Sequence, residues 1–254
     1  MRRRVSDVLC VFLIHLARLR VEAGPFLLSA LVFPAVMYMF ATAIGGNTDA
    51  GAPDPQSRLR FLAGSIVFSL SLTAISYLGY LLLENRFTGR LKLFATLPLA
   101  PSSYVIGVVI FAIAQAAIGT TSLFLVARAF GVRTALSFPV GLLLLGAVIV
   151  LTVLCVCGIG VIIAARARSF SEGSLLTDGL GAGLVFLAPV YCTPDALPRV
   201  LQVFSRVLPT TYAAQGVREA LAGGHNVGGD LLMLAAMATL TLALGFRAMR
   251  WREE

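Results

Sequence analysis

Six apolar stretches, separated by short charged segments, run along the whole sequence. An α-helix rises about 1.5 Å per residue, so about 20 apolar residues cross the roughly 30 Å hydrocarbon core of a bilayer. The uncharged runs that reach or approach this length are Phe26–Ile44, Phe61–Leu83, Tyr104–Val126, Pro139–Ala165, Gly179–Tyr191 (extended toward Leu175 if Asp178 is admitted) and Leu231–Phe246. The pattern therefore predicts an all-α membrane protein with six transmembrane helices.

The composition indicates the same class. Of the 254 residues, 58% are hydrophobic and 13% are charged, and the mean hydropathy is +0.91. A soluble domain carries about 25% charged residues, so this chain lacks the polar surface that a globule needs in water. The net charge of +8 is spread between the apolar runs and forms no basic stripe, which argues against nucleic-acid binding.

The basic residues predict the orientation in the membrane. With both termini in the cytoplasm, the inner segments hold thirteen Lys and Arg residues and the outer segments hold seven. This arrangement is favoured because cytoplasmic loops carry the excess of Lys and Arg. One lysine against nineteen arginines, with abundant Ala and Gly, suggests a GC-rich bacterial genome. We therefore expect a multi-pass protein of the bacterial plasma (inner) membrane with cytoplasmic N- and C-termini.

The N-terminal segment, residues 1–23, has the spacing of an amphipathic helix. Its polar residues fall on one helical face and its apolar residues fall elsewhere. The polar set is Arg4, Asp7, His15, Arg18 and Glu22. We expect an interfacial helix that lies on the inner membrane surface and leads into the first span. We interpret His15 as part of this anchoring helix and not as a catalytic group.

Two further segments differ from ordinary spans. The first, ENRFTGRLKLFATLPLAP from Glu84 to Pro101, lies on the cytoplasmic side between the second and third spans. It predicts a short surface helix, over 84–98, that ends before Pro98 and could dock on a soluble partner. The alternative is a basic inner loop that only sets the topology. The residues alone leave both interpretations open.

The second segment, Tyr191–Leu221, follows the fifth span on the outer side. Apolar residues from Leu197 to Leu208 repeat at helical spacing, but the run is too short and too charged to span. We expect re-entrant or interfacial helices over 192–222, broken at Pro209, with a second short helix from about Thr210 to Ala222.

Together these features resemble the membrane subunit of ABC-2 type transporters, over nearly the whole chain. The most specific part is similar to a family pattern of a Pro-containing span end, a Leu-Pro amphipathic helix, then Pro-x-Thr-Tyr and a downstream Arg. Those residues here are Pro189, Pro194, Leu197, Pro198, Pro209, Thr211, Tyr212 and Arg218. A second match resembles the family's coupling helix, through Glu84, Gly89, Leu91, Leu93, Thr96 and Pro98. Arg90 and Lys92 depart from it, where a small residue and an acid are usual.

The resemblance implies a half-transporter that is one transmembrane domain over residues 1–254. It would act as a homodimer, or as a heterodimer with a homologous permease, together with two cytoplasmic ATP-binding cassette subunits that carry ATP and Mg. The implied cargo is a hydrophobic drug, an antibiotic or a lipid-linked molecule, moved out of the cell. The implied coupling residues are Glu84, Arg86, Gly89, Arg90, Lys92, Thr96 and Pro98.

The residues themselves predict no catalytic, cofactor or metal site in this chain. The four cysteines form no CxxC pair, and His15 and His225 lie far apart in sequence. The only lysine follows Leu91, so the chain has no Gly-x-x-x-x-Gly-Lys-Ser/Thr loop for ATP. The energy for transport would then come from an ATPase partner or, as the alternative, from an ion gradient that drives a secondary transporter or channel. The chain has no clear repeat and few intramembrane charges, which disfavours the alternative.

Polar residues inside the predicted spans suggest a translocation path. Asp178 is the one acid within a span, where it could line the inner entrance, pair with Arg166 or Arg168, or snorkel from a frayed helix start. The second span carries a stripe of hydroxyl groups and the third carries an amide. The candidate path residues are Ser69, Thr73, Ser76, Gln115 and Asp178. Close packing of helices through small polar faces is the alternative for the stripe.

Overall fold

The computed structural model describes residues 2–21, 24, 28–46, 55–90, 96 and 101–248, and its regular elements there are helices. In chain order they are α1 (Arg2–Val21), η1 (Leu28–Val32), α3 (Phe33–Gly46), α4 (Pro55–Phe87), α6 (Pro101–Ala129), α7 (Val140–Arg166), α8 (Phe170–Phe186), η2 (Pro194–Ala196), α9 (Arg199–Ser205), α10 (Pro209–Leu221) and α11 (Gly228–Ala248). The η1 segment is a π-helix that runs directly into α3.

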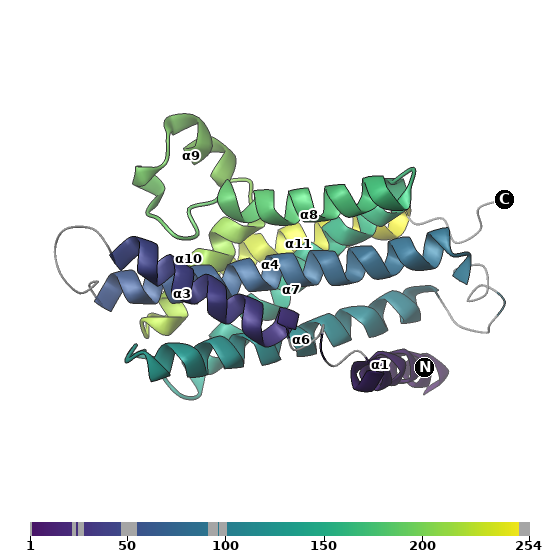
Figure 1. The fold of residues 1–254 in the computed structure, drawn as a ribbon, viewed down its shortest axis with the longest axis horizontal. Helices are drawn as coiled ribbons and strands as arrows, with labels where there is room; N and C mark the ends of the chain where they lie inside the picture. The colour runs from purple at the N-terminus through teal and green to yellow at the C-terminus, as the bar shows by residue number, and fades with distance from the viewer. Residues whose placement is uncertain are drawn as a thin grey trace.

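The long helices lie along one axis, with α4 inside the bundle (Figure 1). Helix α4 contacts α3, α6, α7, α8 and α10. Its side chains are buried on several sides, including Leu62, Ile66, Leu78 and Leu82, none of which is more than 1% exposed. A helix that is apolar all round belongs in the interior, so α4 is the central element on which the others pack.

Four helices in the described part of the chain are long and apolar enough to cross a membrane. They are Gln56–Phe87, Ser102–Ala129, Val140–Arg166 and Gly228–Ala248. The first and fifth apolar runs of the sequence form shorter helices, because α3 has 14 residues after its π-helical turn and α8 has 17. The chain is thus a multi-pass membrane protein with an all-helical fold.

Helix α8 begins and ends earlier in the sequence than the apolar run that predicted it. It begins at Phe170 and ends at Phe186, whereas the run extended from Gly179 to Tyr191. The cause is an N-terminal cap: Ser169 Oγ accepts a hydrogen bond from Glu172 N at 3.1 Å, and Glu172 Oε2 accepts one from Arg168 N at 3.0 Å. This Ser-x-x-Glu signature starts the helix within a charged segment, which a search for uncharged runs passes over.

Small residues bring the spans into close contact. A Cβ atom added at Gly160 of α7 would lie 3.2 Å from the carbonyl oxygen of Ile75 on α4. One added at Gly158 would lie 2.8 Å from the backbone nitrogen of Leu242 on α11. Helices in a membrane associate through such small-residue faces because apolar side chains gain nothing by leaving lipid.

Helix α1 lies beside α6 and is seen nearly end-on in Figure 1, so it runs across the long axis of the bundle. Val11 of α1 packs at the Cα of Gly107, where an added Cβ would meet it at 2.7 Å. Leu9, Leu13 and Leu16 are 44–56% exposed on the other side of the helix. This exposed apolar face fits a helix in the membrane interface.

Candidate functional site

The first candidate site is the turn at the end of α4, within the segment expected to couple to a partner. Gly89 has a φ of +75°, a backbone conformation that glycine adopts without strain, and it ends the helix after Phe87. Thr88 donates from its backbone nitrogen and its hydroxyl to the carbonyl of Glu84, at 2.9 and 2.6 Å. Arg90 reaches back to Glu84, with 2.9 Å between Nη1 and Oε1. The result is a compact charged turn at the bundle end.

Arg86, one of the residues expected to couple to the partner, has a contact inside the protein. Its Nη1 donates to the carbonyl oxygens of Ala164, Ala165 and Ala167, at 3.0, 3.2 and 2.9 Å. These carbonyls lie at the C-terminal end of α7, where a helix has no internal donors left for them. Arg86 therefore caps α7 inside the protein, and a basic group there also suits the negative end of the helix dipole.

The other expected coupling residues divide into two groups. Arg90 and Thr96 are exposed, and Glu84 is partly exposed. Lys92 and Pro98 lie outside the described residues, so the surface helix expected over 84–98 is described only up to Arg90 and at Thr96. Glu84 and Arg86 belong to the last turn of the long helix α4 and precede any separate surface helix.

Asp178 forms the second candidate site, on the face where α8 meets α4. Its Oδ1 accepts a hydrogen bond from Ser76 Oγ at 3.3 Å, and its Oδ2 accepts one from the Tyr80 hydroxyl. The Tyr80 ring lies beside Phe170, with ring centroids 6.5 Å apart. Asp178 makes no ion pair with the described residues Arg166 and Arg168. Its carboxylate is exposed on the outside of this single chain.

The remaining path residues are not gathered around Asp178. Ser69 and Gln115 are buried, at 6% and 4% exposure, and Thr73 is half-buried. Of the expected set, the structure brings together Ser76 and Asp178, and it adds Tyr80, which lies four residues after Ser76 in the hydroxyl stripe of the second span. Ser69 and Gln115 lie in the interior of the helix bundle, where the packing interpretation of the stripe applies.

The third site is the segment between α8 and α11. Helix α10 starts at Pro209, and the three residues that follow tie this start to its surroundings. Thr210 donates to the carbonyl of Leu184 on α8, Thr211 to that of Ser205 at 2.6 Å, and Tyr212 to that of Arg206 at 2.7 Å. The three side chains of the Pro-Thr-Thr-Tyr sequence thus form hydrogen bonds that hold the start of α10 to α8 and to the end of α9.

Arg218 completes this arrangement. Its Nη2 donates to the carbonyls of Pro189, at 2.6 Å, and Val190, and lies 3.4 Å from the Cys192 carbonyl oxygen. Burial, followed by the repulsion of Arg60, lowers the pKa of Arg218 to about 10, so its guanidinium is still charged at neutral pH. A buried cation is costly unless it is hydrogen-bonded, and these carbonyls compensate at Nη2, whereas the buried Nε has no hydrogen-bond partner among the described residues.

Helix α9 leaves an apolar face exposed in the single chain. Pro198 precedes it and is exposed, Ser205 is buried, and the apolar side chains face away from the bundle. The outward residues are Val200, Val203 and Phe204 of α9 and Val207, which follows the helix, each more than 60% exposed. Figure 1 shows α9 projecting at one end of the bundle, above the segment that joins it to α8. An outward apolar face fits an interfacial helix, because lipid would cover it.

Sequence reasoning missed the surroundings of His15. It lies buried between α1, α4 and α6, with Nδ1 3.1 Å from the Tyr77 hydroxyl and its ring 5.7 Å from that of Phe111. The side of α1 that carries Val11 and His15 therefore faces the bundle. The isolated position of His15 among apolar residues was the available signal.

Among the described residues, no three His, Cys, Asp or Glu side chains are grouped so as to hold a metal ion.

The chain is similar to known membrane transporters over most of its length. The profile of the ABC-2 type transporter family matches residues 9–222, which include α3 to α10 and most of α1. A relative, Nodulation protein J of Rhizobium leguminosarum bv. trifolii, is 27% identical over 201 residues. The aligned region covers 78% of this chain and 74% of that protein.

Proposed function

Because the chain belongs to the ABC-2 type transporter family, we propose that it is the permease subunit of an ATP-driven exporter. The observation that carries the proposal is the family match over residues 9–222. In this proposal, the six apolar runs all cross the bacterial inner membrane, both termini are cytoplasmic, and a separate ATP-binding subunit hydrolyses ATP. Two copies, or this chain and a homologue, form the complete membrane part.

The charged turn at the end of α4 is the proposed contact with the ATPase. Glu84 and Arg90 lie at its surface, whereas Arg86 is used inside the protein. A displacement at this turn would pass directly into α4, and α4 touches five other helices. A closing motion of the ATPase can then change how the spans pack, by small shifts of whole helices.

The Asp178 face is the proposed wall of the translocation path. A charged carboxylate within a span costs about 2.5–3.5 kcal/mol at the helix centre, and such residues face water-filled cavities or other protein rather than lipid. Asp178 lies midway along α8 and is exposed in the single chain. A second permease opposite this face would enclose Asp178, Ser76 and Tyr80 in a path between the two copies.

The proposed cargo is a hydrophobic drug, an antibiotic or a lipid-linked molecule. The hydroxyl and carboxylate groups of Ser76, Tyr80 and Asp178 suit a polar head, and the rings of Tyr80 and Phe170 suit an apolar part. This mixture supports an amphiphilic cargo. Nodulation protein J, the relative described above, is named for nodulation, and its name does not state what it carries.

The first experiment asks whether an ATP-binding protein accompanies the chain. The permease is tagged and expressed from its own locus, then isolated in mild detergent and reconstituted in vesicles. We expect a copurifying ATPase and ATP-dependent movement of a fluorescent amphiphile, lost when the P-loop lysine of that ATPase is changed. Transport that persists with the inactive ATPase, or that follows an imposed ion gradient instead, would contradict the proposal.

A second experiment tests the coupling turn. Reversing Arg90 alone (Arg90→Glu) places two acids in the turn and should uncouple ATP hydrolysis from transport. The double variant Glu84→Arg with Arg90→Glu restores the ion pair with its charges exchanged. If the ion pair only maintains the conformation of the turn, the double variant should recover transport. If the ATPase contacts the charged groups directly, the double variant should not recover transport. Arg168→Glu, an exposed arginine outside the turn, is the matched control.

A further inference from the structure

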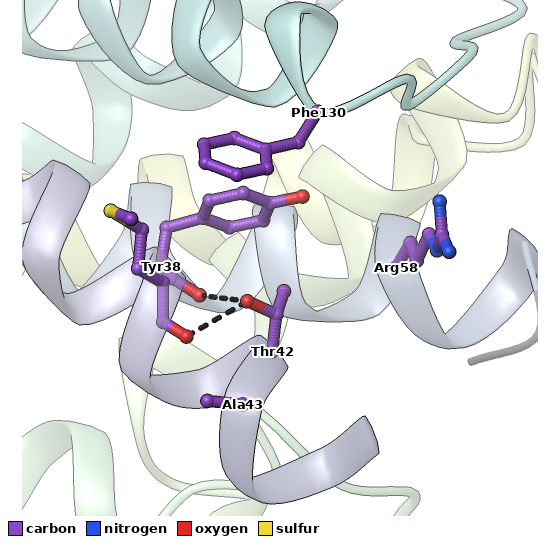
Figure 2. A pocket seen from close by; sticks show the side chains of 6 residues that line it. Tyr38, Thr42, Ala43, Arg58 and Phe130 are labelled. Carbon is purple, nitrogen blue, oxygen red and sulfur yellow. Dashed lines mark hydrogen bonds between the residues drawn. The ribbon is translucent and has the colours of Figure 1, made fainter. Parts of the chain in front are cut away.

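A pocket of about 280 Å³ opens where the ends of α3, α4 and α6 meet. Its walls are Tyr38, Met39, Thr42 and Ala43 of α3, Arg58 of α4, and Phe130, which follows α6. Figure 2 shows the Phe130 ring above that of Tyr38, whose hydroxyl points toward the side on which Arg58 lies. The pocket belongs to the end of the bundle opposite the Glu84–Arg90 turn, because Arg58 is near the start of α4 and the turn follows its last residue.

The polar groups that remain available in this pocket are donors. The Thr42 hydroxyl is already used, since it donates to the carbonyls of Tyr38 and Met39 at 3.0 and 2.8 Å. This leaves the Arg58 guanidinium and the hydroxyl of Tyr38, a residue that is only 2% exposed but lines the pocket. The described part of the chain shows no hydrogen bond or ion pair for either group. None of the six lining residues is acidic.

The backbone adds to the positive charge. Arg58 is the fourth residue of α4, and the first turn of this helix contains no acidic residue. The N-terminal end of a helix carries a partial positive charge, so a cation there is disfavoured unless an anion is near. A pocket with a cation, a free phenol and a helix start therefore favours an anionic ligand.

An apolar stripe, here called the α3 stripe, runs along η1 and α3 and leads away from this pocket. Its residues recur every four positions, at Leu28, Val32, Val36 and Phe40, and they are 43–61% exposed. Residues four apart lie on one face of a helix, and Met39 and Ala43 continue this face into the pocket wall. A ligand that fits both features has an anionic head and an apolar tail.

We propose that this pocket binds the phosphate group of a membrane phospholipid. Arg58 and the Tyr38 hydroxyl would hold the phosphate oxygens, and Phe130 would cover the glycerol end. A pocket for a whole drug-sized ligand measures about 300–1,000 Å³, so this smaller one takes the head alone and the acyl chains run along the α3 stripe. In the orientation proposed above, the lipid belongs to the outer leaflet.

The test measures which lipids the purified full-length protein retains. It is extracted in a mild detergent, incubated with phosphatidylglycerol or with diacylglycerol of the same chains, and analysed by native mass spectrometry. We expect phosphatidylglycerol to remain bound and diacylglycerol, which lacks the phosphate, to be lost. Equal retention of both lipids would overturn the proposal, since the phosphate would then contribute nothing.

Variants locate the binding to this pocket. Arg58→Gln should lower the affinity for phosphatidylglycerol about tenfold or more, as expected for the loss of a charged hydrogen bond. Arg60→Gln is the matched control, because Arg60 lies two residues further along α4 and does not line the pocket. An unchanged affinity in Arg58→Gln, or an equal loss in Arg60→Gln, would contradict the assignment. If Arg58→Gln does not fold, Tyr38→Phe and Arg58→Lys decide instead: Tyr38→Phe should weaken binding and Arg58→Lys should largely keep it.

Inorganic phosphate separates a lipid site from a general anion site. Phosphate at millimolar concentration should not displace phosphatidylglycerol, because it lacks the contacts of the acyl chains with α3. Displacement would show that the pocket takes a free anion and would overturn the assignment to a lipid. None of these measurements involves nucleotide or transport, so their failure and the failure of the proposed export function are distinct results.

Discussion

The guanidinium of Arg218 on α10 lies 2.6 Å from the carbonyl oxygen of Pro189, just beyond the end of α8. Arg86 makes the same kind of contact at the other end of the bundle, where it donates to three carbonyls at the end of α7. Arg86 thus donates to carbonyls that the end of α7 leaves without a donor, and Arg218 donates to carbonyls of the turn that follows α8, each across more than twenty residues of sequence. Arg218 belongs to the family pattern and Arg86 to the expected coupling residues, and both make these contacts inside the protein.

Replacing Arg218 with alanine should destabilise the protein. The carbonyls of Pro189 and Val190 would lose a charged donor in a half-buried place, at a cost of about 1.5–3 kcal/mol, offset in part because no cation is buried. Thermal unfolding in detergent measures this loss. Arg199→Ala, an exposed arginine at the start of α9, is the control and should be nearly neutral. Equal melting temperatures for the two variants would contradict the capping role.

Arg86 and Arg90 should respond differently to substitution. Arg86→Ala removes the cap of α7 and should lower the free energy of unfolding by about 1.5–3 kcal/mol, and the unfolding temperature with it. Arg90→Ala breaks an exposed ion pair, worth about 0.2–1 kcal/mol, so its stability should hardly change. Measured on the reconstituted complex, Arg90→Ala should instead lower transport per ATP hydrolysed. A reversal of these two outcomes would place the partner contact at Arg86.

Gly158→Ala should loosen the contact between α7 and α11. The new methyl group would lie 2.8 Å from the backbone nitrogen of Leu242, which cannot move aside as a side chain could, and overpacking of this kind costs about 1–3 kcal/mol. Gly146→Ala on the same helix meets nothing within 4 Å and should be neutral or slightly stabilising, since alanine is the better helix former. Unfolding curves of both variants in one detergent provide the comparison.

Asp178→Asn should change transport more than it changes stability. The amide retains an oxygen that accepts from Tyr80 or Ser76, so the contact between α4 and α8 survives, whereas the charge is lost. We expect a severalfold fall in ATP-driven export with an unfolding temperature close to that of the parent. Export at the parental rate would remove Asp178 from the path.

Ser69→Ala with Thr73→Ala is the companion test of the stripe on α4, and it should lower export if these residues also line the path.

The packing of α1 against α6 can be tested at Gly107. A leucine there would displace Val11, which lies 2.7 Å from the position of the added Cβ, and should detach α1 from the bundle. Limited proteolysis should then cut the N-terminal segment faster than in the parent. Ile106→Leu, at an exposed neighbouring position on α6, should leave the cleavage rate unchanged. If both variants are cut at the parental rate, Val11 does not hold α1 in place.

Periodicity and composition were sufficient for the class of fold and for the position of most long helices. They could predict α7 closely, because its apolar run is bounded by Pro139 and by Arg166. They misplaced α8, whose start depends on the cap at Ser169 and Glu172 and not on hydrophobicity. A helix that begins within charged residues is visible in sequence only through its capping pattern.

The candidate sites were harder to predict, because they depend on contacts between distant segments. Asp178 was singled out by its charge, but its partners Ser76 and Tyr80 lie about a hundred residues earlier in the chain. Arg86 looked like its neighbours in a basic loop, and only the position of the α7 end shows that it is used internally. The pocket at Arg58 is lined by residues of α3 and α4 and by Phe130, which follows α6. A local sequence pattern cannot predict a pocket formed by such distant segments.

The Arg86 cap has a mechanical consequence. Since the two N–H groups of Arg86 Nη1 are shared among three carbonyl oxygens at the end of α7, the last turn of α4 and the last turn of α7 are held together. A force applied at Glu84 and Arg90 is then delivered to two neighbouring spans at once, and through Gly158 to α11 as well. We expect α4, α7 and α11 to move together as a rigid unit at this end of the bundle. Relative motion of the helices would then occur where such contacts are lacking.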